Sequence, residues 1–243
     1  MNKILNNDDE HYYLGLDEIV QFNMPIYIDN CLLSTMPDIS ENNWKTNSLS
    51  YQLGDLKRPQ NIPKSLVRKC RIHTENRLEI FESEQNVSVS KSIFLEYKTF
   101  NTHLSNCFKR LNNNKNSLGG KNNKKLDELK KLVYKSNDLK DCLSYKSKDV
   151  SIEEKKNIEQ LTRHLINKKM HFSSDGRYVK RIDSIHKDTS YSDAEIVSTA
   201  IVKSMGYKSN ESIILTLDMD VVNIARNFNC LSNNSFVHVY LPD

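Results

Sequence analysis

Two periods of hydrophobic residues run along this chain, and each period predicts a different kind of element. Short apolar runs rich in β-branched residues, bounded by turn formers, predict buried strands. These runs lie within residues 25–33, 86–90, 212–217 and 235–241. Longer stretches with apolar residues every three to four positions predict amphipathic helices. They lie at residues 66–81, 91–111, 126–135, 152–168, 192–205 and 218–228.

The order of these elements predicts the fold class. Strands alternate with helices, and strands that are joined through helices pair in parallel. We therefore predict an α/β fold of three layers, with helices on both faces of a central parallel sheet. Residues 42–63 carry turn formers and few periodic apolar positions, which predicts a loop.

The helix near the C-terminus carries a signal at each of its ends. Ser192-Asp193-Ala194-Glu195 matches a capping box, in which Ser192 caps the helix and Glu195 reaches back to the cap amide. Gly206 stands where a residue in the left-handed conformation commonly ends a helix. We predict that these two signals bound the helix.

The middle of the chain is basic. Residues 112–123 (NNNKNSLGGKNN) have the composition of a flexible linker. The two charged helices after it, at 126–135 and 152–168, predict an inserted helical hairpin. Net charge is +4, and residues 109–181 carry 20 Lys and Arg against nine Asp and Glu. Such a region is either a solvated helical face or a surface for phosphate groups. Candidates for RNA contact are Lys121, Lys124, Lys125, Lys168, Lys169, Lys180 and Arg181.

Composition also limits the class of protein. Five cysteines, an odd number with no Cys-x-x-Cys pair, argue against a disulfide framework and against a zinc ribbon. No apolar stretch approaches the ~20 residues that span a bilayer. Residues 1–10 are polar and acidic, unlike a signal peptide. We therefore expect a soluble, cytoplasmic protein with no membrane partner.

Carboxylates stand at four places where they suit metal chemistry. Asp29 and Asp218 each follow a predicted strand, and ligands of open α/β sheets bind beyond the carboxyl ends of the strands. Asp193 opens the capped helix, and Glu96 lies on the helix after NVSVS. Asp220 follows Asp218 by two residues. Each acid alone also has a structural role open to it, as a helix cap, a turn residue or a solvated side chain.

Such side chains, gathered together, would need a cation. Two carboxylates ~4 Å apart repel by ~4 kcal/mol at an effective dielectric of 20, and a whole domain is stable by only ~5–15 kcal/mol. Oxygen ligands select hard ions such as Mg²⁺ or Mn²⁺. Such ions orient a water for attack on a phosphodiester and stabilise charge on the leaving oxygen.

Four segments, in this order, resemble the PIN domain, a family of Mg²⁺/Mn²⁺-dependent ribonucleases. IYIDNCLLS (26–34) is similar to the family's apolar strand, Asp, small polar residue and helix start. VSVSKSIFLEYKTF (87–100) resembles its strand-then-helix segment with a Glu. YSDAEIVSTAIVKSMG (191–206) resembles the segment in which an Asp opens an Ala-rich helix. ILTLDMDVVNIARNF (214–228) resembles the one in which Thr-x-Asp ends a strand.

The resemblance implies a metal-dependent endoribonuclease that hydrolyses RNA in processing or decay. Its catalytic and metal-binding acids would be Asp29, Glu96, Asp193 and Asp218, with Asp220 as an accessory ligand. Thr216 would orient this cluster and Asn30 would support Asp29, although Asn30 and Cys31 stand where the family commonly has Thr and Asn. Residues 1–24 would be an N-terminal extension, and 25–243 a PIN-like domain with a basic helical insertion at about 112–185.

Two other functions stay open for a chain of this type. One is the toxin of a VapC-type toxin–antitoxin pair, with an antitoxin filling an apolar groove. The other is a PIN-like module that binds RNA or protein without turnover. RNA is the expected partner of the enzyme, and a homodimer or an RNA-processing partner also stays open.

Overall fold

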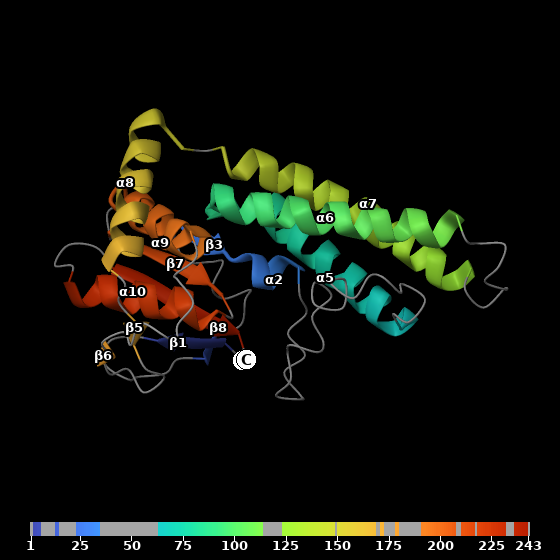
Figure 1. Cartoon of the computed structure of the whole chain (residues 1–243), viewed down its shortest axis with the longest axis horizontal. Helices are drawn as coiled ribbons and strands as arrows, with labels where there is room; N and C mark the ends of the chain where they lie inside the picture. Colours follow the sequence, from blue (N-terminus) through green and yellow to red (C-terminus); the bar gives the residue numbers. More distant parts are fainter. Residues whose placement is uncertain are drawn as a thin grey trace. The chain divides into compact units, whose positions relative to one another are not determined.

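The computed structural model describes most of the chain, and the described residues fall into two compact units (Figure 1). One unit, here the sheet unit, comprises Met1–Asp29, Asn86–Ile93 and Ser147–Asp243. The other, here the helical unit, comprises Asn30–Gln85 and Phe94–Lys146. The described residues are 2–5, 13–14, 23–34, 63–113, 123–148, 150–168, 171–172, 178–179, 191–207, 210–216, 218–231 and 236–242.

The sheet unit is built on a sheet with strand order β2-β1-β8-β7-β3-β4. These strands are β1 (Asn2–Leu5), β2 (Tyr13–Leu14), β3 (Ile26–Ile28), β4 (Val87–Ser88), β7 (Glu211–Leu215) and β8 (Phe236–Pro242). The pairs β8–β7, β7–β3 and β3–β4 are parallel, which confirms the predicted α/β class with a parallel sheet. β1 pairs antiparallel with both β8 and β2, so part of the expected N-terminal extension adds strands to this sheet.

The central strands are buried on both faces. Ile26, Tyr27 and Ile28 of β3 are all buried, as are Ile213 and Ile214 of β7. A parallel strand inside an α/β sheet has helices or other elements over both faces, so it carries a continuous apolar run rather than an alternating one. This is why the short run at 25–33 could be recognised as a strand.

Helices of the sheet unit pack against the sheet and each other. α9 (Tyr191–Ser204) packs on β3, β7 and β8, and α10 (Met219–Leu231) packs on β8 and α9. α8 (Ile152–Lys168) packs on α9 (Figure 1). An ion pair of 3.1 Å between Lys203 Nζ and Glu154 Oε1 joins α9 to α8. A further pair of antiparallel strands, β5 (His171–Phe172) and β6 (Tyr178–Val179), was not predicted.

The helical unit contains α2 (Asn30–Ser34), α5 (Lys64–Ser83), α7 (Asn123–Lys146) and most of α6 (Lys91–Asn113). α5 packs on α7 and on α2. Leucines at heptad-like spacing on α7, Leu129, Leu132, Leu139 and Leu143, are buried in its core. α7 is therefore much longer than the helix predicted at 126–135.

The basic middle of the chain is shared between the two units. The predicted hairpin of helices paired α7 with α8, but α7 packs on α5 in the helical unit and α8 packs on α9 in the sheet unit. The hairpin prediction is therefore wrong. The predicted loop at 42–62 and most of the predicted linker, at 114–122, lie outside the described residues. None of the described helices is long and apolar enough to cross a membrane.

The predicted end of α9 needs a correction. Gly206 does not adopt the left-handed conformation. α9 ends at Ser204 in tight turns, in which the Gly206 amide donates to the Lys203 carbonyl at 3.2 Å and the Tyr207 amide to the Ser204 carbonyl at 3.0 Å. These short-range bonds satisfy the last carbonyls without a left-handed residue. Positive φ occurs instead at Asn210 (54°), immediately before β7, and Asn tolerates it better than most residues.

Candidate functional site

Asp29 continues strand β3 by one residue. Its backbone amide donates to the Leu215 carbonyl of β7 at 2.9 Å, so the ladder between β3 and β7 extends to this position. The residue is buried, with 5% of its surface exposed. A carboxylate is costly to bury unless hydrogen bonds support it. Asp29 therefore places a supported acid at the carboxyl end of β3.

Thr216 supplies that support from the neighbouring strand. It follows β7 directly and is fully buried. Its hydroxyl Oγ1 donates to Asp29 Oδ2 at 2.6 Å, and the same oxygen accepts the backbone amide of Asp218 at 2.8 Å. Hydrogen bonds to an ionised acceptor are short and strong. Thr216 thus makes a hydrogen bond to Asp29, and its role in orienting a metal site stays a prediction.

Asp218 extends the hydrogen-bonded chain to the start of α10. Its Oδ1 accepts the backbone amide of Asp220 at 2.8 Å, and its backbone carbonyl accepts the amide of Val222 at 3.2 Å. This is the geometry of an N-cap. A carboxylate has two oxygens and about four acceptor positions, so capping by Oδ1 does not exhaust it. Asp220 is exposed in the first turn of α10.

Asp193 lies in the first turn of α9 and is half-buried. The C-terminal end of α9 leads through residues 205–210 into the start of β7, and α9 packs on β7. Helices rise ~1.5 Å and strands ~3.3 Å per residue, so the ~17 Å from Ser204 back to Asp193 spans at least the ~13 Å of β7. From these lengths we expect the first turn of α9 to lie near the edge that carries Asp29 and Asp218.

The two remaining predicted residues lie in the helical unit. Glu96 is half-buried on α6, within the residues assigned to that unit, and Asn30 is the first residue of α2. The backbone carbonyl of Asn30 accepts the Ser34 hydroxyl at 2.8 Å. In the sheet unit, hydrogen bonds join Asp29, Thr216, Asp218 and Asp220.

The atom types of these side chains suit a hard cation. Asp29, Thr216, Asp218 and Asp193 offer oxygen atoms alone, which Mg²⁺ and Mn²⁺ prefer. Among the residues that the structure describes, no three His, Cys, Asp or Glu side chains form a group able to hold a metal ion. Mg²⁺ commonly uses one or two carboxylates and completes its shell with waters and substrate phosphates, so a group of three is not required.

The predicted basic residues have varied positions. Lys124 is exposed near the start of α7, whereas its neighbour Lys125 is buried, with 7% of its surface exposed. Burial lowers the pKa of Lys125, against the effect of the nearby Cys107. Lys168 is the last residue of α8. Lys121, Lys169, Lys180 and Arg181 lie outside the described residues.

The predicted capping box on α9 is wrong. The helix begins at Tyr191, one residue before Ser192, and Glu195 is buried. The Glu195 carboxylate accepts the backbone amide of Ser92 at 2.6 Å, at the start of α6. The carboxylate therefore satisfies an amide in the first turn of another helix. Negative charge is stabilising at the N-terminus of a helix. A capping box does form at Ser151-x-x-Glu154, with reciprocal bonds of 2.7 and 3.2 Å.

Comparisons with protein-family models, with curated proteins and with solved structures gave no significant match.

Proposed function

We propose that this chain is a metal-dependent ribonuclease of the PIN type, with a three-layer α/β/α arrangement in its sheet unit. One observation carries the proposal: Asp29, Thr216 and Asp218 are linked by hydrogen bonds at the carboxyl ends of adjacent parallel strands. Thr216 and Asp218 form the Thr-x-Asp of the segment that resembles the family. The long-range link to Asp29 is a property of the folded chain, independent of that resemblance.

The metal would be Mg²⁺ or Mn²⁺, held directly by one or two of the carboxylates of Asp29, Asp193 and Asp218 and otherwise by waters. Asp220 would be an accessory ligand. When bound, the ion supplies a positive charge that lowers the pKa of a water and stabilises the leaving oxygen of the phosphodiester. RNA in processing or decay is the proposed substrate.

The side chains themselves perform the positioning. Thr216 holds Asp29 Oδ2 in one orientation, and its own orientation is held by the Asp218 amide. The N-cap bond to Asp220 fixes one oxygen of Asp218. Groups that are held in place before substrate arrives lose little entropy during reaction. The burial of Asp29 and Thr216 also excludes water from the bonds that hold them.

Cleavage of RNA by two charge-removing variants tests this proposal. We expect Asp29→Asn and Asp193→Asn to abolish Mn²⁺-dependent cleavage of a labelled RNA by the full chain, since Asn keeps the shape of Asp but not its charge. Asp127→Asn is the matched control, because Asp127 is exposed on α7 in the helical unit. Circular dichroism would verify the fold of each variant. Cleavage at the wild-type rate by both Asp29→Asn and Asp193→Asn would refute the site.

A second candidate is a PIN-like module that binds RNA without turnover. It is favoured by the N-cap role of Asp218 and by the absence, within the described ranges, of a group of three metal-binding side chains. Thermal unfolding with added Mn²⁺ separates the two. An ion at ~100 times its Kd stabilises the native state by ~2.7 kcal/mol. The enzyme should gain this stability and Asp29→Asn should not, whereas the module should gain none.

A further inference from the structure

A cavity lies beside the start of α9, within the sheet unit. Its volume is ≈ 480 Å³, in the ~300–1,000 Å³ range of small-ligand sites. Residues from the start of α6, from the segment before α8, and from α8 and α9 line it. The charged and aromatic lining side chains are Lys91, Lys148, Lys155, Glu159, Tyr191 and Glu195.

The charge of this cavity is effectively positive. Glu159 is paired with Arg163, and Glu195 accepts the Ser92 amide at 2.6 Å, so both acids are already engaged. The ammonium groups of Lys91, Lys148 and Lys155 are exposed and have no hydrogen-bond or ion-pair partner among the described residues. Three lysines around one cavity suit a polyanion, since each ammonium can contact a phosphate oxygen.

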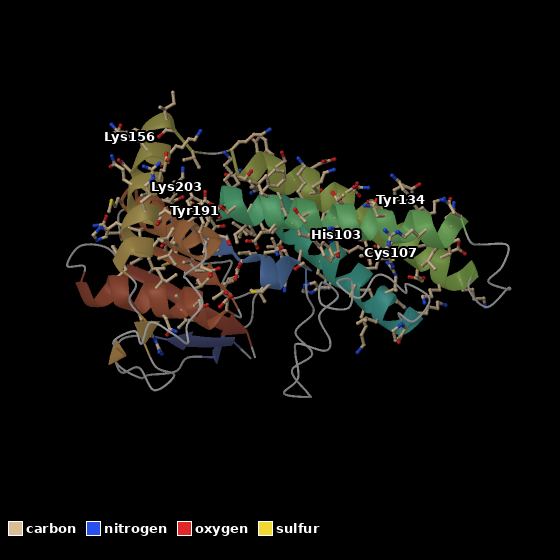
Figure 2. All side chains as sticks on the ribbon, viewed as in Figure 1. His103, Cys107, Tyr134, Lys156, Tyr191 and Lys203 are labelled. Carbon is tan, nitrogen blue, oxygen red and sulfur yellow. The ribbon has the colours of Figure 1, made fainter. Side chains whose placement is uncertain are left out.

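Tyr191 gives the same cavity an aromatic surface. It is the first residue of α9, 49% of its surface is exposed, and Figure 2 shows it among the side chains of the sheet unit. Exposed aromatic rings beside basic groups stack on the unpaired bases of single-stranded nucleic acid. Tyr191 and Asp193 lie in the same turn of α9, within a helix width of ~10–12 Å. An RNA strand that contacts Tyr191 can therefore also reach Asp193.

We propose that this cavity binds a nucleotide of single-stranded RNA, with its base on Tyr191 and its phosphates at Lys91, Lys148 and Lys155. The inference rests on the proposed ribonuclease function and narrows its substrate to unpaired RNA. A base inside a duplex is stacked and paired, so it cannot lie on the Tyr191 ring.

Binding of a short fluorescent oligoadenylate to the full chain, measured by anisotropy in EDTA, tests the aromatic contact. EDTA removes divalent ions and so separates binding from cleavage. We expect Tyr191→Ala to weaken binding about tenfold, in line with the loss of one base stack, and Tyr191→Phe to bind within about twofold of wild type because it keeps the ring. Tyr134→Ala is the matched control, since Tyr134 (labelled in Figure 2) is 58% exposed on α7 and is not one of the residues that line the cavity.

Salt dependence of the same binding tests the lysines. Each phosphate contact contributes ~0.7 to the slope of log K against log salt for single strands. We expect Lys91→Gln, Lys148→Gln and Lys155→Gln each to reduce the slope by about 0.7. Lys156→Gln is the control, because Lys156 (labelled in Figure 2) is exposed on the same helix as Lys155 and is not one of the residues that line the cavity.

The outcomes separate this inference from the proposed function. Binding that is unchanged in Tyr191→Ala and in all three lysine variants would overturn the cavity site, even if Asp193→Asn abolishes cleavage. A lack of binding by the wild-type protein, or a duplex of the same sequence bound as tightly as the single strand, would overturn it as well. Normal oligoadenylate binding without Mn²⁺-dependent cleavage would refute the ribonuclease and leave the cavity site standing.

Discussion

Each unit of this protein buries a hydrogen-bonded polar network, and the two networks differ in charge and in place. In the helical unit, the Ser136 hydroxyl of α7 lies 3.0 Å from Tyr97 Oη and 3.0 Å from Asn101 Nδ2, both on α6. All three side chains are neutral at physiological pH and buried among helices. In the sheet unit, Thr216 links the carboxylate of Asp29 to the backbone amide of Asp218 at the ends of two strands.

Under the proposed function, this difference separates a structural network from the network that positions the metal ligands. Ser136 joins two helices, and its neutral partners carry no charge that a ligand would balance. The chain from Asp29 to Asp218 instead gathers negative charge at the edge where open α/β sheets bind ligands. Burial of a carboxylate costs far more free energy than burial of a hydroxyl, so keeping Asp29 buried lowers the stability of the fold. This contrast suggests variants that should affect one unit only.

The largest effect is expected from Thr216→Val, which removes the hydroxyl between Asp29 and Asp218 at nearly constant volume. Loss of a residue that orients a metal ligand typically lowers activity or metal affinity by roughly 10–100-fold. The loss of a hydrogen bond to a charged group should also lower the free energy of unfolding by roughly 1.5–3 kcal/mol. RNA cleavage and urea unfolding measure the two effects. Thr216→Ser, which keeps the hydroxyl, should stay near wild type, and equal losses in both variants would contradict this role.

A pH effect of roughly 3 kcal/mol is expected in the helical unit, at His73. Burial and the charge of Arg77 lower the pKa of His73 to about 4, although its ring donates to the Leu32 carbonyl at 2.9 Å. The unfolded chain takes up the proton near pH 6.5 and the folded chain only near 4. Unfolding free energy should therefore fall as the pH drops from about 6.5 to about 4.

The control for this pH effect is His73→Gln, because Gln still donates a hydrogen bond but does not titrate. Urea unfolding followed by circular dichroism at several pH values should show a shallower decline for His73→Gln than for wild type. Identical pH profiles for the two proteins would show that other groups cause the decline.

A smaller loss of stability, roughly 1–3 kcal/mol, is expected from Ser136→Ala. The change leaves buried polar groups of Tyr97 and Asn101 without the hydroxyl that they contact. Because this network is neutral and lies in the helical unit, the stabilisation by Mn²⁺ should persist. Thermal unfolding with and without Mn²⁺ measures both. A Ser136→Ala protein that is no longer stabilised by Mn²⁺ would break the distinction between the two networks.

The smallest effect, roughly 0.3–1 kcal/mol, is expected from Glu195→Gln. Gln still accepts the Ser92 amide but removes the charge at the N-terminus of α6. This variant tests whether the buried acids of the sheet unit differ in role, since Glu195 has a backbone partner and Asp29 belongs to the strand-end chain. Stabilisation by Mn²⁺ should survive in Glu195→Gln and disappear in Asp29→Asn, as thermal unfolding would show.

Patterns local in sequence predicted part of the elements. β3, β4, β7 and β8 were each predicted within a few residues, and α8 at its observed bounds, because apolar period depends only on neighbouring residues. The capping pattern was a less reliable predictor, because the partner of a side chain depends on the packing around it. Ser192-x-x-Glu195 and Ser151-x-x-Glu154 share one capping pattern. Glu154 accepts the Ser151 amide of its own pattern, whereas the Glu195 carboxylate accepts the Ser92 amide at the start of α6.

The sequence by itself determined the alternation of strands and helices, the parallel sheet, and the position of Asp29 and Asp218 after buried strands. Only the tertiary structure decided that Thr216 contacts Asp29 across 187 residues of chain, that α7 and α8 pack on different helices, and that Lys91, Lys148, Lys155 and Tyr191 line one cavity. The physical reason is the separation along the chain over which each kind of interaction acts. Backbone periodicity and turn chemistry act over a few residues, whereas contacts between distant side chains depend on how whole elements pack.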